Sequence, residues 1–175
     1  MRRALLCSFV VFLVTVPFLA QTQQWKRHKN PAGNFTVLFP ADPQDSLNKK
    51  DADIESHTLL AVDKPFYYMV IYTAMASDQT VDDSTYKIFK DAVFAQLPKC
   101  EVGSERSAQP VLGGYIGRLY RLHCDTKPNN VNIIGNIYWG KRYAYAVLLM
   151  FPDGSTEPST TDKFLDSFAV LQPGQ

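Results

Sequence analysis

The sequence predicts an α+β protein: a mainly antiparallel sheet of five to seven strands with one long helix and one short C-terminal helix. Residues 66–72 and 143–151 are apolar on both faces, which is typical of central strands covered on both sides. Apolar residues recur at helical spacing over one long segment, residues 81–97. Short turns separate successive strands, which favours antiparallel hairpins, and the two central strands imply helices, or a helix and packed segments, on opposite sides of a single sheet.

Four strands are expected before the long helix. The first alternates apolar and polar residues and ends at Pro40, where the ring removes a backbone donor. The second is polar, as suits a strand at a sheet edge. A turn at Asp63–Pro65 joins the third strand to the fourth. In chain order these strands comprise residues 35–39, 44–50, 57–62 and 66–72.

Both expected helices have an apolar stripe and polar residues at the start. Asp82 and Asp83 begin the long helix, where negative charge suits the helix dipole, and Pro98 ends it. Ser159 or Thr160 is expected to cap the short C-terminal helix. The stripe residues are Tyr86, Phe89, Val93 and Leu97 in the long helix and Phe164, Leu165 and Phe168 in the short one.

Residues 1–20 have the features of a secretory signal peptide. Arg2 and Arg3 precede an uncharged, mostly apolar run that continues to Leu19. This run is shorter than the roughly 20 residues that a membrane-spanning helix needs, so we expect cleavage rather than anchoring. Residues 21–175 would then form a single exported domain, periplasmic or secreted, with no membrane span after cleavage.

The composition is that of a globular protein, with 46% hydrophobic and 20% charged residues. Cleavage would remove two positive charges, Arg2 and Arg3, and lower the formal net charge from +1 to −1. A chain so close to neutrality has no electrostatic attraction to nucleic acid or to an anionic membrane surface, and neither is expected as a partner.

Two cysteines, Cys100 and Cys124, remain after cleavage, and an exported protein meets oxidising conditions in which such a pair becomes a disulfide. The spacing supports this pairing, because Leu112 lies midway between the two cysteines. If residues 100–109 and 115–124 form a hairpin around a three-residue loop at Leu112, the cysteines lie directly opposite each other. Residues 131–139 and 142–151 are expected to form a second hairpin.

No catalytic, cofactor-binding or metal site is indicated, and no cofactor is expected. Cys124 and His123 cannot form a nucleophilic dyad, because adjacent strand residues point to opposite faces. His28, His57 and His123 lie far apart, with no second ligand at metal-binding spacing, although His57 and His123 could meet across the sheet. The sequence has no glycine-rich phosphate loop, nucleophile elbow or HExxH motif.

Five segments, in this order along the chain, match a pattern seen in exported bacterial domains. They are GNFTVLFP at 33–40, YYMVIY at 67–72, GYIGRLY at 114–120, GNIYW at 135–139 and FLDSF at 164–168. In these segments, which extend over nearly the whole mature chain, the protein resembles the PsbP-like family, similar in fold to the extrinsic subunits of photosystems. The resemblance implies an α/β/α sandwich on an antiparallel sheet, no common catalytic residues, and roles in assembly, scaffolding or protein binding.

Three functions remain open. The resemblance favours an exported, non-catalytic binding or scaffolding domain whose partner is a protein in the cell envelope, and not an enzyme. The alternative is a binder of a small apolar, lipid-like molecule in a gap between the sheet and the long helix, and a concave apolar pocket with few polar groups would favour it. The third is a hydrolase of unrecognised type, which a histidine near a carboxylate and a hydroxyl in a cleft would favour.

N-terminal sequencing of the protein from its native host should find a mature chain that begins close to Gln21. The reason is that cleavage is expected directly after the small residue Ala20. Recovery of a cytoplasmic product with Met1 intact would contradict the signal-peptide prediction and would remove the compartment argument for the disulfide.

Overall fold

A computed structural model describes residues 24–50, 53–126 and 129–171 of the chain, and these residues form ten strands and two helices. The predicted signal peptide lies outside the described residues. The elements are β1 (Lys26–Asn30), β2 (Phe35–Phe39), β3 (Gln44–Lys50), β4 (Ile54–Asp63), β5 (Phe66–Met75), α1 (Asp83–Phe94), β6 (Lys99–Ser107), β7 (Ile116–Asp125), β8 (Val131–Trp139), β9 (Tyr143–Pro152), α2 (Thr161–Leu165) and β10 (Ala169–Val170).

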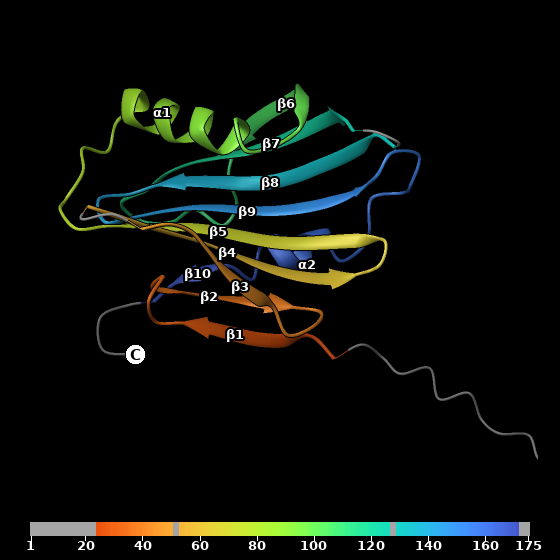
Figure 1. The fold of residues 1–175 in the computed structure, drawn as a ribbon, viewed down its shortest axis with the longest axis horizontal. Helices are drawn as coiled ribbons and strands as arrows, with labels where there is room; N and C mark the ends of the chain where they lie inside the picture. The colour runs from red at the N-terminus through yellow and green to blue at the C-terminus, as the bar shows by residue number, and fades with distance from the viewer. Residues whose placement is uncertain (1–23, 51–52, 127–128, 172–175) are drawn as a thin grey trace, which may run out of the picture.

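The main sheet has seven strands in the order β3-β4-β5-β9-β8-β7-β6, and every neighbouring pair is antiparallel (Figure 1). The polar strand β3 lies at one edge, as the sequence predicted, and β6 lies at the other. The two apolar runs are neighbours in the middle of the sheet. Residues 144–149 of β9 are all buried, whereas β5 is buried only at Tyr68, at residues 70–72 and at Met75, and Tyr67 near its start is 39% exposed.

Helix α1 covers one face of the main sheet. Asp82 caps it, because its side chain accepts a hydrogen bond from the Thr85 backbone N–H, and its own backbone N–H donates one to the Thr85 hydroxyl. Tyr86 and Val93 are buried against the sheet. The helix is shorter than the predicted segment 81–97, because the chain tightens after Phe94 into turns that end at Pro98.

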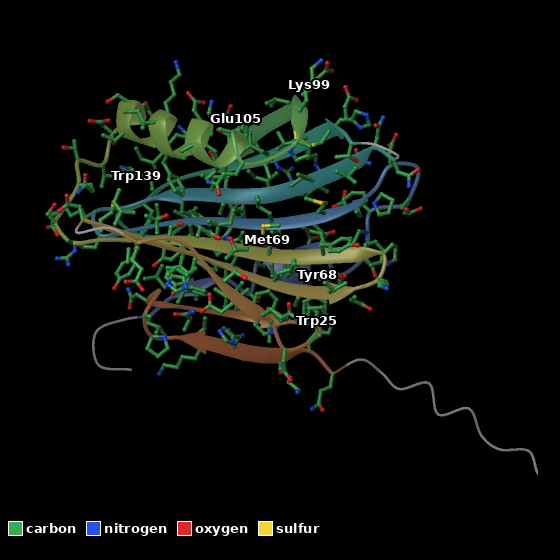
Figure 2. The ribbon with its side chains drawn as sticks, viewed as in Figure 1. Trp25, Tyr68, Met69, Lys99, Glu105 and Trp139 are labelled. Atoms are coloured by element: carbon green, nitrogen blue, oxygen red, sulfur yellow. A yellow bond between two sulfur atoms is a disulfide. The ribbon has the colours of Figure 1, made fainter. Side chains whose placement is uncertain are left out.

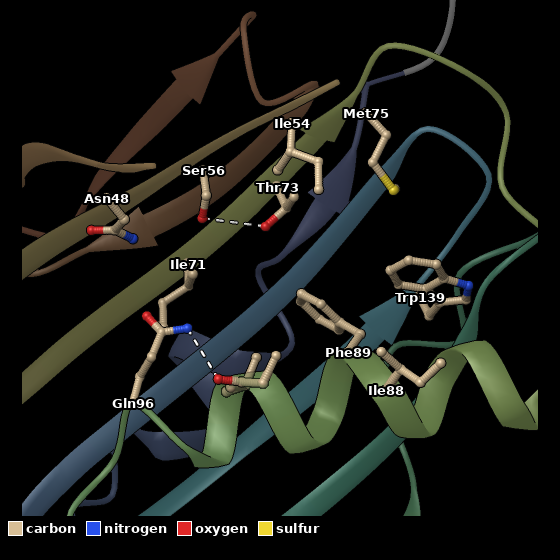
Figure 3. A pocket seen from close by; sticks show the side chains of 12 residues that line it. Asn48, Ile54, Ser56, Ile71, Thr73, Met75, Ile88, Phe89, Gln96 and Trp139 are labelled. Carbon is tan, nitrogen blue, oxygen red and sulfur yellow. Dashed lines mark hydrogen bonds between the residues drawn. The ribbon is translucent and has the colours of Figure 1, made fainter. Parts of the chain in front are cut away.

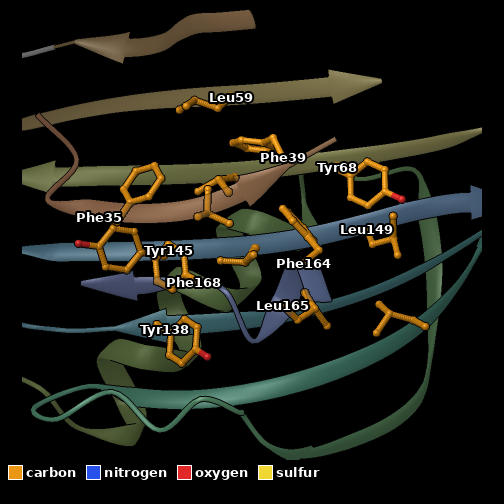
Figure 4. Packing of buried hydrophobic residues seen from close by; sticks show 14 of the residues in the cluster. Phe35, Phe39, Leu59, Tyr68, Tyr138, Tyr145, Leu149, Phe164, Leu165 and Phe168 are labelled. Carbon is orange, nitrogen blue, oxygen red and sulfur yellow. The ribbon is translucent and has the colours of Figure 1, made fainter. Parts of the chain in front are cut away.

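The opposite face is covered by a second sheet, of order β1-β2-β10, and by α2, which has only five residues. The predicted α/β/α sandwich on a single sheet, with one long and one short helix, is therefore wrong, and only its antiparallel pairing is seen. The chain is mostly β, and strands rather than a helical layer fill the second face. Figure 4 shows the cluster between the sheets, where Phe35 and Phe39 from β2 meet Phe164 and Phe168.

The small sheet was missed because its pairing is long-range and its outer strand is polar. The segment Lys26–Asn30 has no apolar alternation, yet every residue of it pairs with β2. The connection is tight: a Cβ on Gly33 would lie 2.6 Å from the Phe35 ring, and Asn34 adopts a left-handed backbone with φ of 57°. In Figure 2, Trp25 lies beside Tyr68, and their ring centroids are 5.3 Å apart where the two sheets meet.

The predicted disulfide is present. Cys100 in β6 is paired directly with Cys124 in β7, and their Cα atoms are 3.9 Å apart. The hairpin differs from the prediction in two details. The ladder has an irregularity at Gly103, and the connection runs from residue 108 to residue 115 instead of three residues, with Gly114 at positive φ. Neither helix in the described part of the chain is long and apolar enough to cross a membrane.

Reduction of the disulfide, or the substitution Cys100→Ser, should lower the free energy of unfolding by roughly 2–4 kcal/mol without loss of the fold. The cross-link restricts the unfolded chain, while the two hydrophobic clusters stay intact. Urea unfolding of oxidised and reduced protein measures the difference. Titration of thiols in unfolded, non-reduced mature protein should find none, and two reactive thiols per chain would contradict the bond.

Candidate functional site

An apolar groove lies between α1 and strands β3, β4 and β5 of the main sheet (Figure 3). Its volume is about 440 Å³, and it is open to solvent along one side. The lining is predominantly aliphatic, aromatic and thioether surface. It consists of Asn48 from β3, Ile54 and Ser56 from β4, Ile71, Thr73 and Met75 from β5, Trp139 from β8, and Ile88, Phe89, Ala92, Val93 and Gln96 from α1 and the residues that follow it.

The floor of the groove follows from strand alternation. Ile54 is paired with Met75, and Ser56 with Thr73, so these four side chains stand on the face that α1 covers in part. The alternate residues of β4 and β5 point to the other face, where Leu59, Val70 and Tyr72 belong to the cluster beneath the small sheet. The groove and the aromatic cluster of Figure 4 thus lie on opposite faces of the same two strands, β4 and β5.

Helix α1 forms one wall of the groove, and its apolar residues there include one that is not buried in the core. Val93 is buried, and Phe89 lies against Trp139 with the ring centroids 5.5 Å apart. Ile88 is 71% exposed and faces the same groove, as Figure 3 shows. An exposed isoleucine beside an apolar groove leaves hydrocarbon surface in water that a ligand or partner would cover.

The polar side chains in the lining are largely engaged with the protein itself. Four of them donate hydrogen bonds to protein oxygens, so they orient the lining without offering those donors to a guest. The bonds run from Thr73 Oγ1 to Ser56 Oγ (3.3 Å), from Asn48 Nδ2 to Thr58 Oγ1 (2.7 Å), from Gln96 Nε2 to Ala92 O (3.1 Å) and from Trp139 Nε1 to Thr80 O (2.8 Å). A guest in this groove is therefore recognised mainly by apolar contact.

A second cluster, around His57, lies on the opposite face of β4. The His57 ring nitrogens are each 3.0 Å from a carboxylate, Nδ1 from Asp45 and Nε2 from Glu55, and the ring stacks on Tyr72. Partial burial opposes protonation, but the hydrogen bonds and charges of Glu55 and Asp45 outweigh it, so the pKa of His57 is raised above its ordinary value of 6.5.

The His57 cluster does not have the geometry of a hydrolase. Both ring nitrogens are bonded to carboxylates, so neither is available to take a proton from a nucleophilic hydroxyl. His57 and His123 do not meet, because β5, β9 and β8 separate β4 from β7. His123 lies instead beside Asn132, and its neighbour Cys124 is held in the disulfide. His28 is half-buried, and its ring lies edge-on to Phe39.

Among the described residues, no cluster of three or more His, Cys, Asp or Glu side chains is placed to hold a metal ion. The expected helix residues Phe89 and Val93 do reach the groove, from the stripe that the sequence assigned to core packing. The sequence analysis did not single out Ile54, Met75 or Ile88. Ile88 did carry a signal, because it is an isoleucine that lies outside the predicted apolar stripe of its helix.

Comparison with known proteins adds no relative: no protein-family model matches the chain, and no curated protein matches it. The resemblance to PsbP-like domains therefore stays a prediction. The candidate site rests on geometry alone.

Two substitutions in the groove should separate residues that hold the fold from residues that face a guest. Val93→Ala should lower the free energy of unfolding by roughly 1.5–3 kcal/mol, because this side chain is 1% exposed and packs on the sheet. Ile88→Ala should change it by less than about 0.5 kcal/mol, because the side chain is mostly in water. Chemical denaturation measures both, and equal losses would show that Ile88 belongs to the core.

Proposed function

We propose that the chain is an exported, non-catalytic binding protein whose ligand is a small apolar, lipid-like molecule held in the groove beside α1. The observation that supports this proposal is the groove itself, with an apolar lining whose polar groups are largely bonded within the protein. This is the concave apolar pocket with few polar groups that the sequence analysis named as the mark of such a binder. The disulfide is compatible with an exported protein.

The size of the groove suits a ligand of this kind. Its volume of about 440 Å³ lies within the range of roughly 300–1,000 Å³ that small-molecule sites occupy. If roughly 300 Å² of apolar ligand surface is buried at about 25 cal/mol per Å², the gain is about 7.5 kcal/mol before the costs of association. A micromolar complex needs about 8.2 kcal/mol, so we expect dissociation constants weaker than micromolar.

A protein partner, which the sequence analysis placed first, is the second candidate. It is supported by the exposure of Ile88 at the open side of the groove, where an apolar side chain of another protein could insert. The two candidates can be told apart with purified protein. A small apolar molecule should bind to it with no other protein present, whereas a protein partner would have to be added.

Purified protein should bind the neutral fluorescent probe N-phenyl-1-naphthylamine, and 1-dodecanol should displace it. Ile88→Asn should weaken probe binding at least about fivefold, because it replaces hydrocarbon in the wall with a polar amide. The matched control is Val111→Asn, since Val111 is equally exposed, at 76%, but lies in the β6–β7 connection outside the groove.

Fluorescence titration of the three proteins is the measurement, with urea unfolding to confirm equal stability. Failure of the wild-type protein to bind the probe, or equal loss in both variants, would contradict the proposed ligand class. In that case, recovery of a defined envelope protein by wild type and by Val111→Asn but not by Ile88→Asn would support the protein partner instead.

A further inference from the structure

Strand β3 has a single neighbouring strand in the main sheet. It is the outermost strand of the main sheet, and it pairs with β4 alone. Its side chains are exposed from Gln44 to Asn48, and the ladder has an irregularity between Leu47 and Lys49. An edge strand of this kind depends on side-chain links as well as on its backbone ladder, and its protection against local opening is low.

Side-chain links between β3 and β4 lie on both faces of the sheet. On the groove face, Asn48 Nδ2 donates to Thr58 Oγ1 over 2.7 Å, and Asn48 lines the groove. On the opposite face, the Asp45 carboxylate of β3 is 3.0 Å from Nδ1 of His57. The position of Asn48 in the groove wall is thus coupled to the His57 link through one short strand.

The geometry around His57 fits the protonated ring. Glu55 Oε1 and Asp45 Oδ1 accept hydrogen bonds only, so both ring nitrogens must carry a proton to satisfy both carboxylates. A neutral ring leaves one lone pair facing a carboxylate, and the two negative charges then repel each other across it. The Tyr72 ring lies parallel to His57, with 5.0 Å between the centroids, and a π face also favours a cation.

The surroundings contain the following titratable or charged groups. Asp45 faces His57 from β3, Glu55 faces it from β4, and the Tyr72 ring covers it from β5. From the small sheet, Asn30 hydrogen-bonds the Tyr72 hydroxyl, and His28 lies within electrostatic range of Asp45. Burial lowers the pKa of His28, so it loses its charge at a lower pH than His57 does.

We propose that the protonated ring of His57 clamps β3 onto β4, and that loss of the proton loosens β3 and weakens ligand binding in the groove. The second part rests on the proposed function, whereas the first does not. Because the pKa of His57 is raised in the folded protein, the clamp is fully present below the ordinary value of 6.5 and is lost as the pH rises through the higher folded value. The groove would therefore hold its ligand more tightly in mildly acidic than in alkaline surroundings.

Amide hydrogen exchange of β3 and β4, corrected for intrinsic rates, tests the clamp at about pH 5.5 and about pH 8.5. The wild-type protein should lose about fivefold protection in β3 at the higher pH, the size expected for one ion pair. His57→Phe keeps a ring on Tyr72 without a titrating nitrogen, so β3 should exchange equally at both pH values. His123→Gln is the matched control on β7 and should keep the wild-type response.

Asp45→Asn supplies an independent test if His57→Phe fails to fold. It removes the anion from the β3 side of the clamp and should reduce β3 protection already at the lower pH. Protection of β3 that does not change with pH in wild type, or a pH response that survives in His57→Phe or in Asp45→Asn, would overturn the clamp.

Titration with N-phenyl-1-naphthylamine at the same two pH values tests the link to the groove, because the probe carries no charge at either. Wild type should bind it more weakly at the higher pH, and His57→Phe should bind it equally at both. Absence of binding at both pH values would reject the proposed function and leave the exchange result to decide the clamp. Equal binding by wild type at both pH values, with β3 protection changing, would reject the coupling and keep the clamp.

Discussion

The packing of the β2 aromatic face on the main sheet is the contact from which the rest of the structure follows. Phe35 lies within 6 Å of the rings of Tyr72, Tyr145 and Phe168, measured between ring centroids, and so joins β2, β5, β9 and the segment after α2. This contact decides which face of β4 and β5 is turned inward. Because strand side chains alternate, seating Leu59 and Tyr72 beneath the small sheet sends the other set of residues to the α1 face, where they form the floor of the groove.

The groove exists because one helix is too narrow for the face that it covers. A helix with its side chains is about 10 Å wide, whereas seven strands spaced about 4.8 Å apart span about 29 Å. Helix α1 packs over the β8 side, with Tyr86 and Phe94 near Tyr120 of β7, and leaves β4 and β5 partly uncovered. On the other face, a three-stranded sheet and α2 together pack over these strands.

Strand β4 carries different chemistry on its two faces. Toward α1 it presents Ile54 and Ser56 to the groove, and toward the small sheet it presents Glu55 and His57 in a charged cluster. The edge strand β3 takes part in both, through Asn48 on one face and Asp45 on the other. A change of charge in the His57 cluster on one face can therefore alter the apolar groove on the other face through β3, without any rearrangement of the core.

The sequence by itself determined the features that depend on near neighbours along the chain. The register that opposes Cys100 to Cys124, the capped start of α1 and the apolar runs of β5 and β9 all follow from local spacing, turn chemistry or periodicity. Tertiary structure alone decided the rest. Ala169 and Val170 pair with β2, the polar β1 segment becomes a strand, and Ile54 and Ile88 line one groove, so each of these features joins residues distant in sequence. Such contacts depend on which apolar faces can be buried against each other in the folded chain. Local secondary-structure propensity does not contain that information.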